Sequence, residues 1–364
     1  MLHSPQYITT LPQTPANHPP PHKQSGNHAA ALALAARTRH IPAHIIMPTI
    51  STPSKIAATQ SHGAHVHFSG STAPEREALL AEVQAKTGAV FVPPYDHPDI
   101  ILGQGTLALE FESQVREIGE RRGREEEEQQ GWGWRFRMER ERERERERER
   151  ARKAEVDIGK DGDGVDVHST GARHASSGLD AVIAPCGGGG MLSGVATALH
   201  GTGILVFGAE PSFEGADDCR RGLASDPPQR VETVKTLTIA DGLRTPVGKI
   251  PWSIISDKSK VRAVYSVSEE QIKSAMRLLV ERMKIVVEPS AAVPLAVALY
   301  DESFRQMVAK EAGDQGWNVG IVLSGGNTTM EAIGKLFATD DHKAERQQAK
   351  VGKDGEKVAE NVAG

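Results

Sequence analysis

The sequence is poor in the residues that mark several classes of protein. Its 364 residues include two cysteines, Cys186 and Cys219, and only 4% are aromatic. Two thiols cannot build a disulfide framework, so a disulfide-stapled secreted scaffold is excluded and a reducing compartment is favoured. No apolar run is long enough to cross a bilayer, and the Pro- and His-rich start lacks the charged and apolar regions of a signal peptide. We therefore expect a cytoplasmic protein without a membrane partner.

Overall charge and length exclude little else. The formal net charge is −5, which does not indicate binding to nucleic acid. The chain is long enough for two domains and a sizeable core.

Strand and helix patterns alternate at short spacing, which favours an α/β fold with parallel sheets. The expected strands are 43–47, 64–68, 89–92, 179–185, 204–209 and 319–323. The expected helices are 25–39, 53–61, 73–87, 100–114, 191–200, 269–284 and 291–300.

Three stretches do not fit a globular pattern. Residues 1–24 have no periodicity and are interpreted as disordered or as a wrongly assigned start. Residues 116–178 form an insertion, Glu/Arg-rich to 153 and then linker-like; its strict Glu-Arg alternation would place like charges at i,i+4 of a solvated helix. Residues 339–364 are a polar tail.

The most informative motif is a glycine run after an apolar strand. Cys186 is followed by four glycines and Met191, where a helix is expected to begin. Glycines let the backbone approach an anion closely, and the amides at the start of a helix point toward it. This context predicts a phosphate-binding cup more strongly than a flexible turn.

Three further segments are ambiguous when taken singly. Ser25-Gly26-Asn27-His28 opens a helix, where simple capping is the alternative. Glu210, Asp217 and Asp218 suit a hard cation, although a solvated acidic loop is the commoner explanation for such residues. Residues 324–327, Ser-Gly-Gly-Asn, follow a buried strand, where either a ligand or a tight turn is expected.

Together and in this order, the four segments resemble fold-type II pyridoxal-phosphate (PLP) enzymes, and most closely the serine racemase and serine/threonine dehydratase branch. The resemblance runs through residues 103–110, 209–212, 240–242 and 281–284. It implies two domains with parallel-rich sheets flanked by helices, with the N-terminal part of the large domain missing. The implied division is a small domain at 25–96 and a large PLP-binding domain at 97–115 and 179–338.

The resemblance also implies roles for individual residues. Ser25 would be the acid/base on one face of the substrate, and residues 25–28 (Ser25, Gly26, Asn27, His28) would hold its carboxylate. Asn27 would bond the ring hydroxyl, Ser324 would face the pyridine nitrogen, and Gly242 and Glu288 would lie near the cofactor. The phosphate would be held by Gly187, Gly188, Gly189, Gly190 and Met191. Glu210, Asp218 and the Ala216 carbonyl resemble a site for Mg²⁺, Mn²⁺ or Ca²⁺.

The implied chemistry is loss of an α-proton from an amino acid bound to PLP. Return of the proton on the other face racemises serine, and loss of the β-hydroxyl leads to pyruvate and ammonia. Serine, threonine and 3-hydroxyaspartate are all candidate substrates, and the family implies a homodimer.

The sequence departs from the family at two places. The segment of Ser-x-Lys-x-Arg-Gly type that carries the Schiff-base lysine is not found; Lys23 and Lys55 lie in other settings. With the insertion, this suggests a gene model with a lost exon and a retained intron. Two interpretations stay open: a PLP racemase/dehydratase, and a relative without the catalytic lysine that binds PLP or metal but is inactive. A scaffold acting through the Glu/Arg stretch is the weakest alternative.

Overall fold

The computed structural model describes residues 7–9, 26–51, 53–122 and 178–338. The chain forms two compact units, Met1–Leu109 with Asp180–Gly364 and, separately, Glu110–Leu179. The predicted tail at 339–364 and most of the predicted insertion lie outside the described residues. A helix begins at residue 98 and continues to residue 122, so it includes the first charged residues of the predicted insertion.

The first sheet of unit one has the strand order β3-β2-β1-β4. Its strands are β1 (Tyr7–Thr9), β2 (His44–Pro48), β3 (His65–Ser69) and β4 (Val90–Val92), and its helices are α1 (Gly26–Thr38), α2 (Pro53–Gln60) and α3 (Ala73–Thr87). β2 and β3 are parallel, whereas β1 is antiparallel to both neighbours. The prediction that residues 1–24 carry no ordered element is therefore wrong for Tyr7–Thr9.

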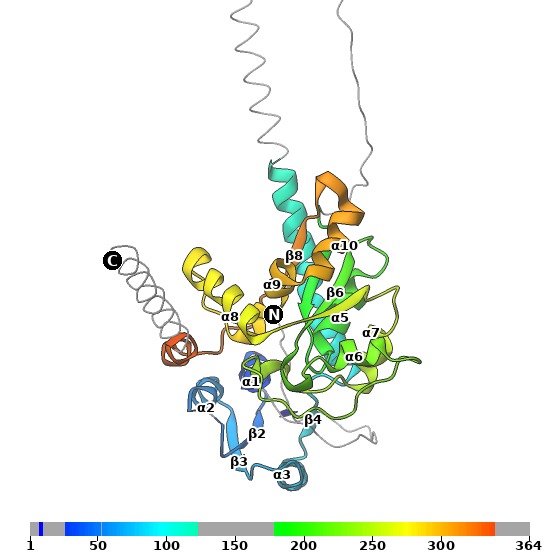
Figure 1. Cartoon of the computed structure of the whole chain (residues 1–364). Coiled ribbons are helices and arrows are strands. Elements are labelled where there is room, and N and C mark those ends of the chain that lie inside the picture. The colour runs from blue at the N-terminus through cyan, green and yellow to red at the C-terminus, as the bar shows by residue number, and fades with distance from the viewer. Residues whose placement is uncertain (1–6, 10–25, 52, 123–177, 339–364) are drawn as a thin grey trace, which may run out of the picture. The chain divides into compact units, whose positions relative to one another are not determined.

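The second sheet is entirely parallel, in the order β7-β6-β5-β8. Its strands are β5 (Ala181–Pro185), β6 (Leu205–Pro211), β7 (Ala263–Val267) and β8 (Val319–Ile321). The α-helices that follow residue 180 are labelled in Figure 1: α5 (Gly190–Leu199), α6 (Asp218–Ala224), α7 (Lys249–Ile255), α8 (Glu269–Leu278), α9 (Pro289–Tyr300) and α10 (Glu302–Ala312). The predicted α/β class with parallel-rich sheets is confirmed.

Alternation along the strands explains how this sheet is covered. Ile183 and Phe207 belong to the large core that contains α8 and α9, and the Phe207 ring meets Phe304 edge-on with centroids 5.4 Å apart. Neighbouring strand residues point the other way, and at Gly208 an added Cβ would lie 2.7 Å from Leu192 of α5. The sheet is thus buried on both faces, as parallel sheets require.

Local signals set several helix ends. At α3 the Glu75 carboxylate accepts a hydrogen bond from the Thr72 backbone N–H at 2.9 Å, and Gly88 ends the helix with φ of 69°. At α8 the Ser268 hydroxyl accepts from the Gln271 N–H. The helix predicted over 269–284 is present: α8 continues directly into a π-helical turn over Leu279–Met283. Among the described helices, none is long and apolar enough to span a membrane.

Candidate active site

A cavity of about 170 Å³ opens beyond the carboxyl ends of the parallel strands. β5 lies between β6 and β8, so the chain leaves it in one direction and later returns on its other side. Such a switch point is where open α/β sheets bind ligands. The glycine run follows β5 and Ser324 follows β8, and both line the cavity.

The glycine run forms the base of one wall. Gly189 has φ of +84°, a conformation that favours glycine, and α5 begins at the next residue. A Cβ at Gly188 would overlap the ring of Tyr95, and one at Gly190 would lie 2.9 Å from the Tyr95 Cβ. Side chains are therefore excluded at both positions. The cup and the start of a ten-residue helix suit a phosphate group.

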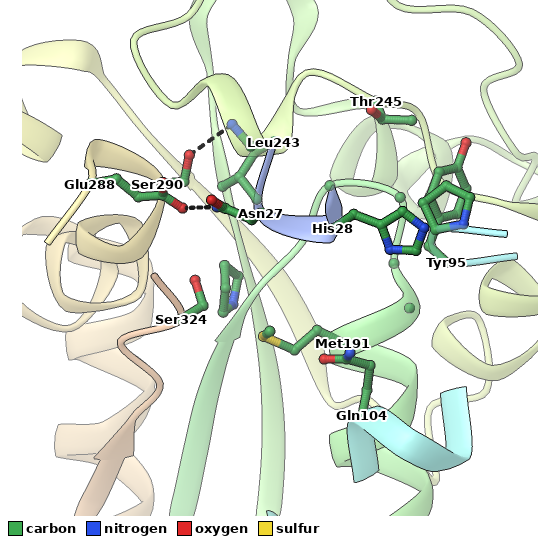
Figure 2. A pocket seen from close by; sticks show the side chains of 17 residues that line it. Asn27, His28, Tyr95, Gln104, Met191, Leu243, Thr245, Glu288, Ser290 and Ser324 are labelled. Atoms are coloured by element: carbon green, nitrogen blue, oxygen red, sulfur yellow. Dashed lines mark hydrogen bonds between the residues drawn. The ribbon is translucent and has the colours of Figure 1, made fainter. Parts of the chain in front are cut away.

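The opposite wall carries a partly buried carboxyl–amide pair. The Asn27 Nδ2 donates to the Glu288 Oε1 at 2.5 Å, the contact drawn as a dashed line in Figure 2. A Cβ at Gly325 would lie 2.5 Å from the same oxygen, so glycine is what lets the carboxylate sit there. Burial, followed by the charge of Asp241, raises the pKa of Glu288 to about 7, against the lowering effects of Asn27 and Lys55.

Two neighbouring contacts hold this wall in place. The Lys55 Nζ donates to the Asp241 Oδ2 at 2.5 Å, which ties α2 to the segment before Gly242. The Ser290 Oγ accepts from the Gly242 N–H at 2.9 Å, the second dashed line in Figure 2. Both contacts bring distant parts of unit one together beside the cavity.

Of the acidic residues predicted as a cation site, Glu210 and Asp218 lie near each other, whereas Asp217 pairs with Arg220 and Arg221. Glu210 is fully buried, and its two oxygens accept the N–H groups of Cys219 and Arg220 at 3.1 and 2.9 Å. The Asp218 Oδ2 accepts from the Val247 N–H at 3.1 Å. Burial raises the pKa of Asp218 to about 7, and that of Glu210 well above its usual range.

Both cysteines, which the sequence suggested only as free thiols, lie beside this group. One ligand atom from each of Cys186, Glu210 and Cys219 lies within 4.8 Å of the others, and all three residues are buried. Ala216 is buried as well, two residues before Asp218. Phe213–Gly215, just before Ala216, form a short 3-10 helix in which Glu214 has φ of 49°.

The cavity gathers most of the residues predicted for the cofactor and substrate. These are Asn27, His28, Gly187, Gly188, Gly189, Gly190, Met191, Gly242, Glu288 and Ser324. Gly26 is the first residue of α1, and Ser25 lies outside the described residues. Burial lowers the pKa of His28 well below its usual range. The structure brings these residues together; the role of each stays a prediction.

The sequence reasoning gave no role to seven other lining residues. They are Pro94, Tyr95, Gln104, Pro185, Leu243, Thr245 and Ser290. Gln104 falls inside the motif noted at 103–110, and Ser290 lies two residues after Glu288, so both had a signal in the sequence. Tyr95, which packs on the glycine cup, had none. Among the described residues that line the cavity, none is a lysine.

Comparison with known proteins gives one family and consistent relatives. The family model described as "Pyridoxal-phosphate dependent enzyme" matches residues 23–121 and 142–325. The chain is 32% identical over 317 residues to the L-threo-3-hydroxyaspartate ammonia-lyase of Saccharomyces cerevisiae, covering 86% of this chain and 74% of that protein. It is 32% identical to serine racemase of Oryza sativa subsp. indica, covering 85% and 71%. The solved structure of maize serine racemase matches with a TM-score of 0.62 at 31% identity, covering 89% and 77%.

Proposed function

The chain belongs to the pyridoxal-phosphate-dependent enzyme family, and from its site we propose that it racemises serine and eliminates water from small hydroxy amino acids. The observation that carries the proposal is the cavity itself. It has a glycine cup and a helix start at one side, and the Asn27–Glu288 pair and Ser324 at the other. Relatives named as racemases and as a hydroxyaspartate ammonia-lyase support both activities.

The cofactor fits these residues. PLP, when bound, supplies an electron sink for the charge left at the α-carbon when its proton departs. The amides of 187–190 would hold its phosphate, where Cβ atoms would leave no room. The Asn27 amide, which now donates to Glu288, would donate to the ring hydroxyl oxygen. Ser324 would face the pyridine nitrogen; a hydroxyl there does not force that nitrogen to be protonated, so the sink is a moderate one.

The proton transfers fall to side chains of this chain. Ser25 would take or return the α-proton on one face, and the amides of residues 25–28 would orient the substrate carboxylate. Return of a proton on the opposite face of the α-carbon gives the opposite enantiomer. When the β-hydroxyl leaves instead, serine loses water and then, by hydrolysis, ammonia, to give pyruvate. Threonine and 3-hydroxyaspartate carry the same β-hydroxyl and are substrates of the same class.

A second candidate is a non-catalytic relative that binds PLP. It is favoured by the absence of lysine among the described residues that line the cavity, because the family chemistry begins from a Schiff base to lysine. The test is to incubate the purified chain with PLP and L-serine and to measure D-serine, pyruvate and PLP bound at equilibrium. Borohydride reduction followed by peptide mapping would locate any lysine adduct.

The outcomes separate the candidates. Turnover that is lost in Asn27→Ala supports the racemase/dehydratase. PLP binding without turnover in the parent chain supports the non-catalytic relative. If PLP does not bind at all, or binds equally well to Asn27→Ala and to a chain with Gly188→Val, the proposed site is wrong.

We also propose that Glu210, Asp218 and the Ala216 carbonyl hold Mg²⁺, or Mn²⁺ or Ca²⁺. Two buried carboxyl groups with raised pKa values are more easily ionised next to a divalent cation, and oxygen ligands suit these ions. Mg²⁺ should raise the melting temperature of the parent chain but not of Asp218→Asn. An equal shift in both would contradict the assignment. We also propose that the protein is a homodimer. We propose a cytoplasmic location, where both free cysteines stay reduced.

A further inference from the structure

The first sheet carries a cluster of three histidines that takes no part in the proposed function. β2 and β3 pair in parallel with His44 opposite His65 and Ile46 opposite His67. Ile45, Met47 and Val66 pack into a core with α1 and α2. Because successive strand residues face opposite sides, His44, His65 and His67 share the other face.

The rings of this cluster are already close together. The His44 Nδ1 and the His67 Nε2 are 3.1 Å apart. The His65 ring stacks on that of His44 with centroids 5.0 Å apart, and the His67 ring lies 5.3 Å from His44. None of the three is among the residues that line the active-site cavity.

We propose that His44, His65 and His67 form a binding site for a transition-metal ion of the borderline class, such as Zn²⁺. Two nitrogens bound to one tetrahedral zinc at about 2.0–2.1 Å lie roughly 3.3 Å apart, close to the observed separation. His65 is exposed, so rotation about its side-chain bonds can bring a third nitrogen to the same point. Imidazole ligands select zinc, copper and nickel over magnesium and calcium.

The electrostatic surroundings favour the metal-binding form of the rings. Burial, and then the other two histidines, lowers the pKa of His44. Burial and His65 also lower the pKa of His67, whereas Glu82 of α3 raises it. The neutral imidazole that results can coordinate a metal without first losing a proton. Glu82, now paired with Lys86 at 2.5 Å, adds a carboxylate beside the cluster.

The alternative for the same geometry is a hydrogen bond in which one neutral ring donates to the other. That pair needs no metal, and it leaves the His65 ring with only its stacking contact. A bound metal would instead join β2 to β3 at the start of both strands. The site does not rest on the proposed function, because its residues lie apart from the cavity.

The test is zinc binding to the full chain by isothermal titration, in a Cys219→Ala background that breaks up the buried group of Cys186, Glu210 and Cys219. His44→Ala and His67→Gln should each weaken binding at least roughly tenfold, the smallest loss typical of removing even an outer partner of a metal. His65→Ala, at an exposed position, should weaken it without changing the fold. His200→Ala removes another exposed histidine and should match the parent.

A metal-free unfolding curve for each variant separates loss of the site from loss of the fold. A zinc dissociation constant for His67→Gln and His65→Ala within twofold of the parent would overturn the proposal. So would a loss in His200→Ala equal to that in the cluster variants.

Discussion

Gly194 offers a sharp test of how the glycine cup is positioned. It lies in α5, where a Cβ would overlap the carbonyl oxygen of Ile101 and lie 2.6 Å from the Gly105 N. Both contacts are backbone atoms of the helix that begins at residue 98, so neither can swing aside. The close approach of these two helices therefore requires glycine and fixes the direction in which α5 presents its first turn.

The cost of Gly194→Ala can be compared with that of a matched change. In a helix interior, replacing glycine with alanine usually stabilises by about 1 kcal/mol. Gly103→Ala should show that gain, because nothing lies within 4 Å of an added Cβ there. Gly194→Ala must also displace a packed helix, and overpacking costs about 1–3 kcal/mol. Because both variants share the alanine gain, their free energies of unfolding should differ by the overpacking cost alone, roughly 1–3 kcal/mol.

Urea unfolding followed by circular dichroism measures this difference, and equilibrium dialysis of PLP measures its effect on the cup. Gly194→Ala should unfold at lower urea and bind PLP more weakly, whereas Gly103→Ala should unfold at higher urea with unchanged PLP binding. If both variants are equally stable, the helices do not depend on this contact and the reasoning fails.

Two further outcomes follow from burial. Folding raises the pKa of Glu288 from 4.5 to about 7, so the folded state binds that proton more tightly; stability should fall as pH rises from about 4.5 through 7, by up to roughly 3 kcal/mol. Glu288→Gln should flatten that slope in urea titrations across this range, and an unchanged slope would refute the assignment. Cys186 and Cys219 are buried, so a thiol reagent should modify them only as the protein unfolds; rapid labelling of the native protein would contradict their placement.

Local patterns were enough to predict most of the elements. α3 begins and ends where the sequence placed it, because the Thr72 and Glu75 capping pair and Gly88 are local signals. The parallel second sheet followed from apolar strands alternating with helices. β1 was missed because its three residues are held by pairing with β2 and β4, which no periodicity within residues 1–24 records.

The residues of the candidate site that lie in sequence motifs were predicted, whereas groupings that depend on tertiary contacts were missed. The glycine run, Asn27, Glu288 and Ser324 lay in recognisable segments, and all line the cavity. Cys186 and Cys219 come close to Glu210 only through the packing of β5, β6 and α6. The spacing of these residues in the sequence matches no metal-binding motif. The histidine cluster likewise appears only once the register of β2 and β3 is known.

The long insertion does not conflict with an assembled site. Three contacts bring the walls together: Asn27 with Glu288, Lys55 with Asp241, and the Asp96 carboxylate with the N–H groups of residues 249 and 250. Each joins a residue before Leu109 to one after Asp180, within one compact unit. Closing a longer connection costs only roughly 0.6 kcal/mol per doubling of its length, so extending a ten-residue link to the span Glu110–Leu179 costs about 2 kcal/mol. The first two contacts are partly buried and those of Asp96 are exposed. A hydrogen bond contributes about 0.5–1.5 kcal/mol in net terms, so these four bonds together can offset that cost and keep the cavity formed.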